Sequence, residues 1–190
     1  MYSSQLKYVD VSILSTLAGI IESNPSVTIT VACSRGLTTY AVRMLKYLSH
    51  KYKNRWSVKW NSQWSEQVFM MSEHDLVIWP ITRDGFSIIG TTALCLGTPV
   101  MAWNVPPINE CLSNDNSVLV GCDLEYNWLG MPEAKQDYMA FERSLRYLIS
   151  SNTLLGKLRK HTKDDLLERK EVFNSSLDMI LNNTHVRHRW

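Results

Sequence analysis

The 190-residue sequence lacks several features that assign a protein class at once. No apolar run reaches the roughly 18 residues that a membrane-crossing helix requires, and residues 1–7 lack the apolar stretch of a secretory signal. The formal net charge is only +2, with no basic stripe, so electrostatics give no case for nucleic acid. We therefore expect a cytoplasmic protein with no transmembrane segment and no nucleic-acid partner.

The four cysteines and five histidines show none of the close spacings that zinc and redox sites use. Apolar neighbours flank each cysteine, so we expect buried free thiols at Cys33, Cys95, Cys111 and Cys122. The closest histidine pair, His185 and His188, has no third ligand nearby. Because Walker and Gly-x-Gly-x-x-Gly loops are also missing, we expect no metal and no resident cofactor.

Two further groups of residues each allow a functional and a structural interpretation. His74 next to Asp75 has the composition of a catalytic pair, but the two residues enter a predicted strand, which favours a histidine satisfied at the core boundary. Trp56 and Trp60 share one strand face by the period of two and, with Trp64, have rings able to stack on sugars or bases. We expect core burial of Trp56 and Trp60 instead.

Strand and helix patterns alternate through the first two thirds of the chain. Short apolar, β-branched runs predict strands at 27–32, 56–60, 75–79, 98–103 and 117–120, and helical spacing of apolar residues predicts helices at 11–21, 38–52, 64–71 and 87–96. This alternation implies an α/β fold with a doubly wound parallel sheet. After about residue 135 we predict only helices, at 138–149, 154–161 and 164–181, covering a sheet face. We expect one domain over residues 1–184 and a frayed tail at 185–190.

The residues from Asp75 to Val100 predict a strand, a loop, a helix and a second strand in that order. Gly85 permits a tight turn, and Ser87 is suited to cap the helix. Ligands of an open parallel sheet bind beyond the carboxyl ends of its strands, where this loop must lie. A helix that begins at Phe86 or Ser87 would offer free N–H groups to an anion such as a diphosphate. Plain strand-to-helix geometry would produce the same pattern.

The residue identities give this segment a more specific meaning. It resembles the signature of the retaining glycosyltransferase group that includes glycogen synthase, which reads Pro-x-x-x-Glu-Gly-Phe-Gly, four variable residues, Glu-Ala-Leu-Ala-x-Gly-x-Pro-Val. The matches in register are Pro80, Gly85, Phe86, Ala93, Leu94, Gly97, Pro99 and Val100. Residues 7–10 resemble the group's Lys-Gly-Val-Asp, and residues 104–110 resemble its loop with a Glu before the last strand. The resemblance implies a Rossmann-like half of a GT-B fold, namely the donor-binding C-terminal domain.

The resemblance also implies roles for individual residues. The nucleotide-sugar-binding set consists of Lys7, Arg83, Gly85, Phe86, Ser87, Ile88 and Thr92, with Asp84 as the catalytic residue that orients the sugar. The backbone amides of 86–88 would hold the diphosphate at the helix end, together with Lys7 and Arg83. A solvated Lys7, an exposed Arg83 without a ligand, and a turn or capping role for Asp84 are the structural alternatives.

Four positions depart from the family pattern. Asp84 and Thr92 stand where the family has two Glu residues, and the hydroxyl of Thr92 cannot bind a ribose in two places as a carboxylate does. Tyr2 stands where the family has an Arg five residues before its Lys, so Arg83 is the candidate for the missing cation. Ser87 replaces the family's second loop Gly. These departures predict weaker or altered nucleotide binding.

We therefore expect the donor-binding half of a retaining, metal-independent glycosyltransferase of polysaccharide biosynthesis. It would transfer a hexose from a nucleotide diphosphate sugar to a glycan or lipid-linked acceptor. The alternatives are a non-catalytic nucleotide-sugar-binding or assembly subunit, and a fragment that needs a separate acceptor-binding domain. The partners expected are the nucleotide sugar, the acceptor, and an acceptor-domain protein or further copies of the chain. A protein partner would bring the chain to a membrane surface, and we expect an exposed apolar patch where it docks.

Overall fold

Two parallel sheets of three strands form the centre of the computed structural model, which describes residues 2–3, 11–33, 37–82 and 87–185. The strands are β1 (Tyr2–Ser3), β2 (Ile29–Cys33), β3 (Trp56–Trp60), β4 (Val77–Trp79), β5 (Val100–Trp103) and β6 (Ser117–Val120). Within the sheets the orders are β1-β2-β3 and β4-β5-β6, and β1 also lies beside β4. The combined order is β3-β2-β1-β4-β5-β6, that of a doubly wound fold. The predicted fold class is confirmed.

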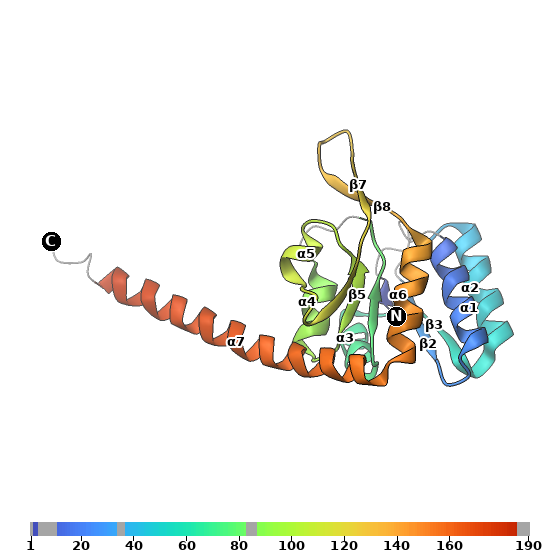
Figure 1. Ribbon diagram of the computed structural model, residues 1–190, viewed down its shortest axis with the longest axis horizontal. Helices are drawn as coiled ribbons and strands as arrows, with labels where there is room; N and C mark the ends of the chain where they lie inside the picture. The colour runs from blue at the N-terminus through green and yellow to red at the C-terminus, as the bar shows by residue number, and fades with distance from the viewer. Residues whose placement is uncertain (1, 4–10, 34–36, 83–86, 186–190) are drawn as a thin grey trace.

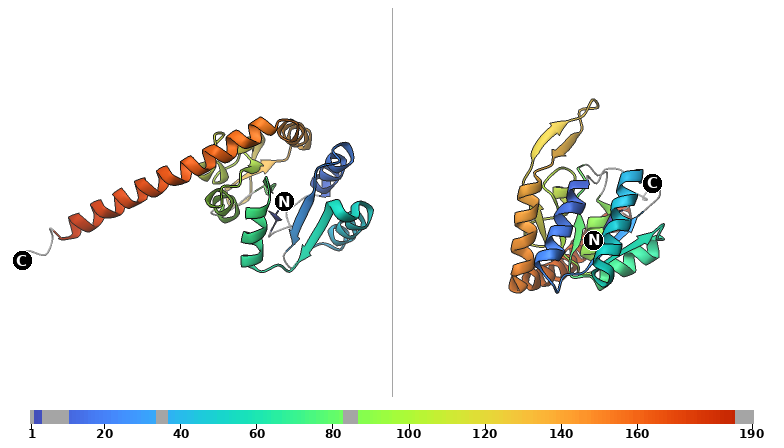
Figure 2. Two further views of the ribbon diagram at one scale, coloured as in Figure 1. Left: turned by 90° about the horizontal axis from the view of Figure 1, so that it is seen from below. Right: turned by 90° about the vertical axis from the view of Figure 1, so that its right-hand side faces the viewer.

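Helices lie on both sides of this sheet (Figures 1 and 2). They are α1 (Val11–Ser23), α2 (Thr39–Tyr52), α3 (Trp64–Glu73), α4 (Ile88–Cys95), α5 (Ile108–Cys111), α6 (Tyr138–Ser150) and α7 (Asn152–His185), with a 3-10 turn, η2 (Lys53–Arg55), before β3. Helix α1 packs against α2 and α6 on one side, and α3 packs against α4 on the other. The first turn of α2 is capped by Thr38, whose hydroxyl accepts a hydrogen bond from the Ala41 N–H at 3.2 Å.

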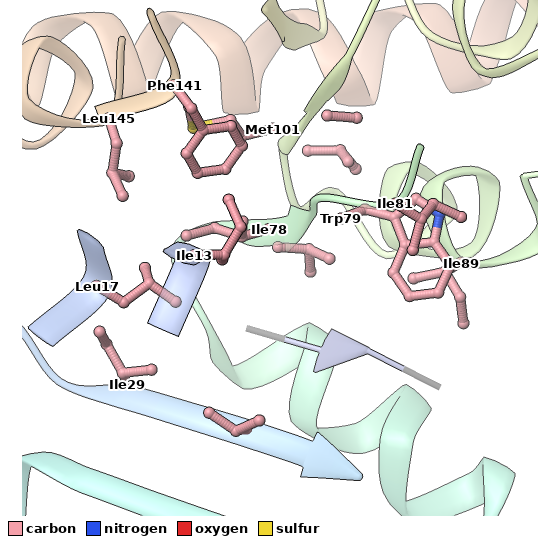
Figure 3. Packing of buried hydrophobic residues seen from close by; sticks show 14 of the residues in the cluster. Ile13, Leu17, Ile29, Ile78, Trp79, Ile81, Ile89, Met101, Phe141 and Leu145 are labelled. Carbon is pink, nitrogen blue, oxygen red and sulfur yellow. The ribbon is translucent and has the colours of Figure 1, made fainter. Parts of the chain in front are cut away.

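Buried aliphatic and aromatic side chains join the two halves of the sheet into one core (Figure 3). On one side, Ile78 of β4 lies among side chains of α1 and α6, including Ile13 and Phe141. On the other side, Trp79 lies with Ile89 of α4. Because neighbouring residues of a strand face opposite sides, β4 supports both helical layers.

A β-hairpin that the sequence patterns did not predict rises from the domain (Figure 1). Its strands are β7 (Asp123–Tyr126) and β8 (Pro132–Lys135), paired antiparallel with Leu124 opposite Ala134. Ala134 is buried, and its N–H donates to the Thr82 carbonyl at 2.8 Å, which fixes the base of the hairpin to the loop after β4. All four residues of β7 are exposed.

The last helix differs from the prediction of two helices. α7 runs without a break because no glycine or proline separates the two predicted segments. At the predicted junction, the Thr162 hydroxyl donates a hydrogen bond to the Leu158 carbonyl oxygen at 2.7 Å. The early turns pack on α4 and α6, whereas the rest projects away from the domain (Figure 1). The covering role that we predicted therefore applies to α6 and the beginning of α7. Within the described residues, no helix is long and apolar enough to cross a membrane.

Burial departs from expectation at three of the four cysteines and at one of the two tryptophans. No cysteine forms a disulfide, yet only Cys33 is fully buried, and Cys95 is exposed on α4, so the expectation of four buried thiols is wrong. Trp56 lies in the core as predicted, but Trp60 is 42% exposed at the end of β3. The reason is that β3 is the last strand of its sheet and has only one neighbouring strand to cover it.

Candidate functional site

The carboxyl ends of β4 and β5 and the beginning of α4 meet at one edge of the sheet. Strand β4 ends at Trp79, and its successor Pro80 accepts a hydrogen bond from the Trp103 indole at 3.3 Å, which ties the loop to the end of β5. Thr82 then holds the hairpin through its carbonyl. Five predicted site residues lie outside the described residues: Lys7, Arg83, Asp84, Gly85 and Phe86. Ser87, Ile88 and Thr92 are described.

Ser87 begins α4 in a left-handed backbone conformation, with φ 47° and ψ 41°. It occupies the N-cap position, but its hydroxyl makes no capping hydrogen bond, so the predicted capping role is wrong. In capping serines the backbone is extended, which turns the hydroxyl toward the first amides. The left-handed turn rotates the Ser87 side chain away from them. The N–H groups of the first turn of α4 therefore depend on partners outside the helix.

Two hydroxyls, those of Ser87 and Thr91, are buried beneath this turn and have no hydrogen-bond partner among the residues that the structure describes. The two residues are four apart and so share one side of α4. The packing there is tight, because a methyl group placed on Gly90 would lie 2.8 Å from the Ser87 Oγ and 3.3 Å from the Leu112 Cδ2. Thr91 is a feature that sequence comparison missed, since it precedes the position aligned with the family's Glu. The spacing of four residues from Ser87 was the available signal.

Ile88 and Thr92 form a second pair at helical spacing, on another side of α4. Ile88 is 57% exposed, and Thr92 is half-buried. The structure thus brings three of the predicted residues to one helix end, with Ser87 inside and Ile88 outside. Thr92 lies one turn further along the helix than Ile88.

A shallow hollow of about 530 Å³ lies at the base of the hairpin on the same edge. It is lined by residues 121–123 and 135–139, which flank β7 and β8. Cys122 donates a hydrogen bond from its thiol to the Asn104 carbonyl at 3.6 Å, and burial is the main cause that raises the pKa of this thiol. Another hollow, of about 320 Å³, is lined by residues 26–29 and 73–76 among others, and contains none of the predicted site residues.

His74 is half-buried at the end of α3, three residues before β4, as the structural interpretation predicts. Its Nδ1 lies 2.5 Å from the Met70 carbonyl oxygen, and burial lowers the pKa of its imidazole. The neighbouring carboxylate of Asp75 forms an ion pair with Arg159 at 2.9 Å rather than with the imidazole. Among the described residues, no three His, Cys, Asp or Glu side chains converge as metal ligands would.

The sequence of this chain matches no known sequence-family profile and no curated protein. Its structure matches TarM of S. aureus with a TM-score of 0.67 and 11% identity, over 94% of this chain and 34% of TarM. It matches HepE of Anabaena, solved in complex with UDP-glucose, with a TM-score of 0.66 and 15% identity, over 96% of this chain and 47% of HepE.

A third solved structure contains one domain only. It is the C-terminal domain of LpcC, a glycosyl transferase group 1 family protein from Francisella tularensis, matched with a TM-score of 0.61 and 18% identity. That match covers 90% of this chain and 82% of the LpcC chain. This chain has the fold of a GT-B glycosyltransferase C-terminal domain.

The structural matches also show how much of each known protein this chain resembles. The chain spans about a third of TarM and about half of HepE, at 34% and 47% of their lengths, but most of the LpcC domain, at 82%. It is therefore similar to one half of a two-domain architecture. Within that half, the edge that carries Ser87 and Thr82 is the carboxyl edge, where open α/β folds bind their ligands.

Proposed function

We propose that the chain binds a nucleotide diphosphate sugar at the carboxyl edge of its sheet. It would serve as the donor half of a retaining, metal-independent glycosyltransferase that moves a hexose to a glycan or lipid-linked acceptor. The observation that carries the proposal is the left-handed Ser87 at the start of α4. This residue stands where the retaining family has a glycine, the residue type that adopts this conformation most readily.

The geometry supports a diphosphate at this helix end. The first-turn N–H groups of α4 have no partners within the helix, and they lie at the positive end of its dipole. Ser87, in its left-handed conformation, begins this helix end. Lys7 and Arg83 would add positive charge, and Asp84 would orient the sugar. The preorganised donors would stabilise charge on the departing diphosphate without a metal ion.

A second candidate function is nucleotide-sugar binding without catalysis, as an assembly subunit. Two observations favour it. Thr92 is a half-buried hydroxyl where the family has a carboxylate, and Tyr2 lies in β1 opposite Ala32 where the family has an arginine. Both changes remove a charged group from the donor site, so they are expected to weaken the hold on ribose and diphosphate.

Calorimetric titration with UDP, GDP and ADP and with their glucose or mannose conjugates tests the donor site. We expect one nucleotide series to bind, and Lys7→Ala and Asp84→Ala each to weaken binding of its sugar conjugate. A chain that binds none of these compounds would refute both candidate functions. Mass spectrometry of acceptor mixtures then separates the two, because only an enzyme releases free nucleoside diphosphate from the conjugate.

Replacing Thr92 by Glu provides a gain-of-function test. A carboxylate at this position would accept hydrogen bonds from two ribose hydroxyls, so we expect nucleotide affinity to rise by about tenfold, from two charge-assisted bonds. Thr153→Glu, on the exposed start of α7, makes the same charge change and serves as the control. Equal affinities in all three proteins would argue against ribose at this side of α4.

A further inference from the structure

Strand β7 has an open edge along its whole length. Ala134 of β8 sends its N–H to Thr82, away from β7, so Leu124 and Ala134 form a pair without mutual hydrogen bonds. In such a pair the N–H and C=O of Leu124 also point away from β8, and those of Tyr126, two residues on, do the same. Among the described residues, no backbone group pairs with them. The edge is therefore free to accept another strand.

The turn of the hairpin holds this edge in a fixed shape. The Asn127 side-chain oxygen accepts hydrogen bonds from the N–H groups of Leu129 and Met131, at 2.9 and 3.1 Å. Its amide nitrogen donates to the Glu133 carboxylate at 3.0 Å. The Asn127 backbone closes the turn with Gly130 and Met131. An edge that is already ordered loses little conformational entropy when a strand joins it.

The side chains of β7 specify what such a strand must carry. Leu124 and Tyr126 face one side and are 42% and 69% exposed, and Trp128 in the turn is 90% exposed. Asp123 and Glu125 face the other side and both are exposed, and Glu125 also forms an ion pair with Lys135 of β8 at 3.9 Å. A complementary strand would alternate apolar with basic residues. Pairing of β7 with β7 of a second copy would oppose acidic side chains, which is unfavourable.

Residues 186–190 of this chain, Val-Arg-His-Arg-Trp, have the required alternation. In an extended strand, Arg187 and Arg189 would fall on one face, and Val186, His188 and Trp190 would fall on the other. They follow α7, whose 34 residues span about 50 Å and which leaves the domain in a different direction from the hairpin (Figures 1 and 2). Helix α7 therefore leads away from the hairpin of its own copy.

We propose that β7 accepts residues 186–190 of a second copy as an added strand. In an antiparallel register, Arg189 and Arg187 would face Asp123 and Glu125, His188 would lie opposite Leu124, and Val186 would lie opposite Tyr126. Main-chain hydrogen bonds would give affinity, and the alternating side chains would give specificity. This contact links copies of the chain and does not depend on the proposed donor site.

A charge exchange tests this pairing. The probe is a fluorescein-labelled synthetic peptide of residues 184–190, and the receptor is the chain shortened to residues 1–185, measured by fluorescence anisotropy. Changing both Asp123 and Glu125 to Lys replaces two attractive pairs by two repulsive ones, so we expect binding roughly tenfold weaker. A peptide with Glu at both arginine positions should bind this variant and not the original receptor. Asp164→Lys with Glu168→Lys, on exposed α7 positions, is the matched control and should leave peptide binding unchanged.

The same variants have an expected effect on association of the full chain. Sedimentation velocity should show concentration-dependent association of residues 1–190, which weakens with added salt because the charge pairs are exposed. The shortened chain and the variant with lysines at 123 and 125 should remain monomeric. No peptide binding up to about 1 mM would overturn the proposal. Peptide affinity that is unchanged by the charge exchange would also overturn it. Both outcomes are independent of the nucleotide titrations.

Discussion

Replacing Ser87 by Gly should stabilise the protein, although the residue is fully buried. The left-handed conformation costs a non-glycine residue about 1–2 kcal/mol, and a buried hydroxyl without a partner costs about 1–3 kcal/mol. Glycine also makes the unfolded chain more flexible, which reduces this gain by about 0.5–1 kcal/mol. Taking the low end of each range, we expect a rise of about 1–2 kcal/mol in the free energy of unfolding.

Urea unfolding followed by circular dichroism measures this change, and a thermal melt should show a rise of about 3–6 °C for a chain of this size. Ser87→Ala separates the two causes, because alanine loses the hydroxyl but keeps the strained backbone. We expect its stability to lie between those of the serine and glycine proteins. If the glycine variant is less stable than the original, the hydroxyl has a favourable partner and the reasoning fails. If alanine equals glycine, the backbone is not strained.

Three further changes probe other parts of the structure. Gly90→Ala should destabilise by roughly 1–3 kcal/mol through overpacking, and by less in the Ser87→Gly background, because the Oγ at 2.8 Å is then gone. Burial raises the pKa of the Cys33 thiol from 9.0 to about 12. Between these two pH values the thiol ionises in the unfolded chain but not in the folded chain, so the free energy of unfolding falls as pH rises from 9.0 to about 12. Cys33→Ala should flatten this decline in urea titrations. Asn127→Ala should speed amide hydrogen exchange in the hairpin and leave α4 unchanged; equal exchange rates would count against an ordered turn.

Sequence patterns predicted β2 to β6 because each is a short run rich in apolar or β-branched residues, and they did not predict β1 (Tyr2–Ser3). The predicted bounds of β3 and β6 agree with the structure, and those of β2, β4 and β5 differ by one or two residues. The hairpin escaped prediction because β7 has no buried residue, so its Asp-Leu-Glu-Tyr alternation is short and contains two charges. What fixes it is the contact between Ala134 and Thr82, which are far apart in sequence. No local pattern contains that contact.

For the site, the sequence located the segment and missed its conformation. The resemblance to the glycosyltransferase signature placed Ser87 at the start of a helix, and the structure confirms that position. The capping role failed because a capping serine is usually extended, whereas Ser87 is left-handed and its hydroxyl makes no capping hydrogen bond. The family's glycine at this position was the available indication. Asp84 and Lys7 remain predictions.

Within the described residues, the two halves of the sheet meet at β1 and β4. β1 contributes two residues, paired with Ala32 and Cys33 of β2, and it meets β4 as a neighbour. In the described residues, cohesion across this seam therefore comes mainly from side chains of the shared core and little from a hydrogen-bonded ladder. A ligand lying over the seam would touch both halves at once. Its binding free energy would then add to the free energy needed to separate the two halves, so the ligand would stabilise their association.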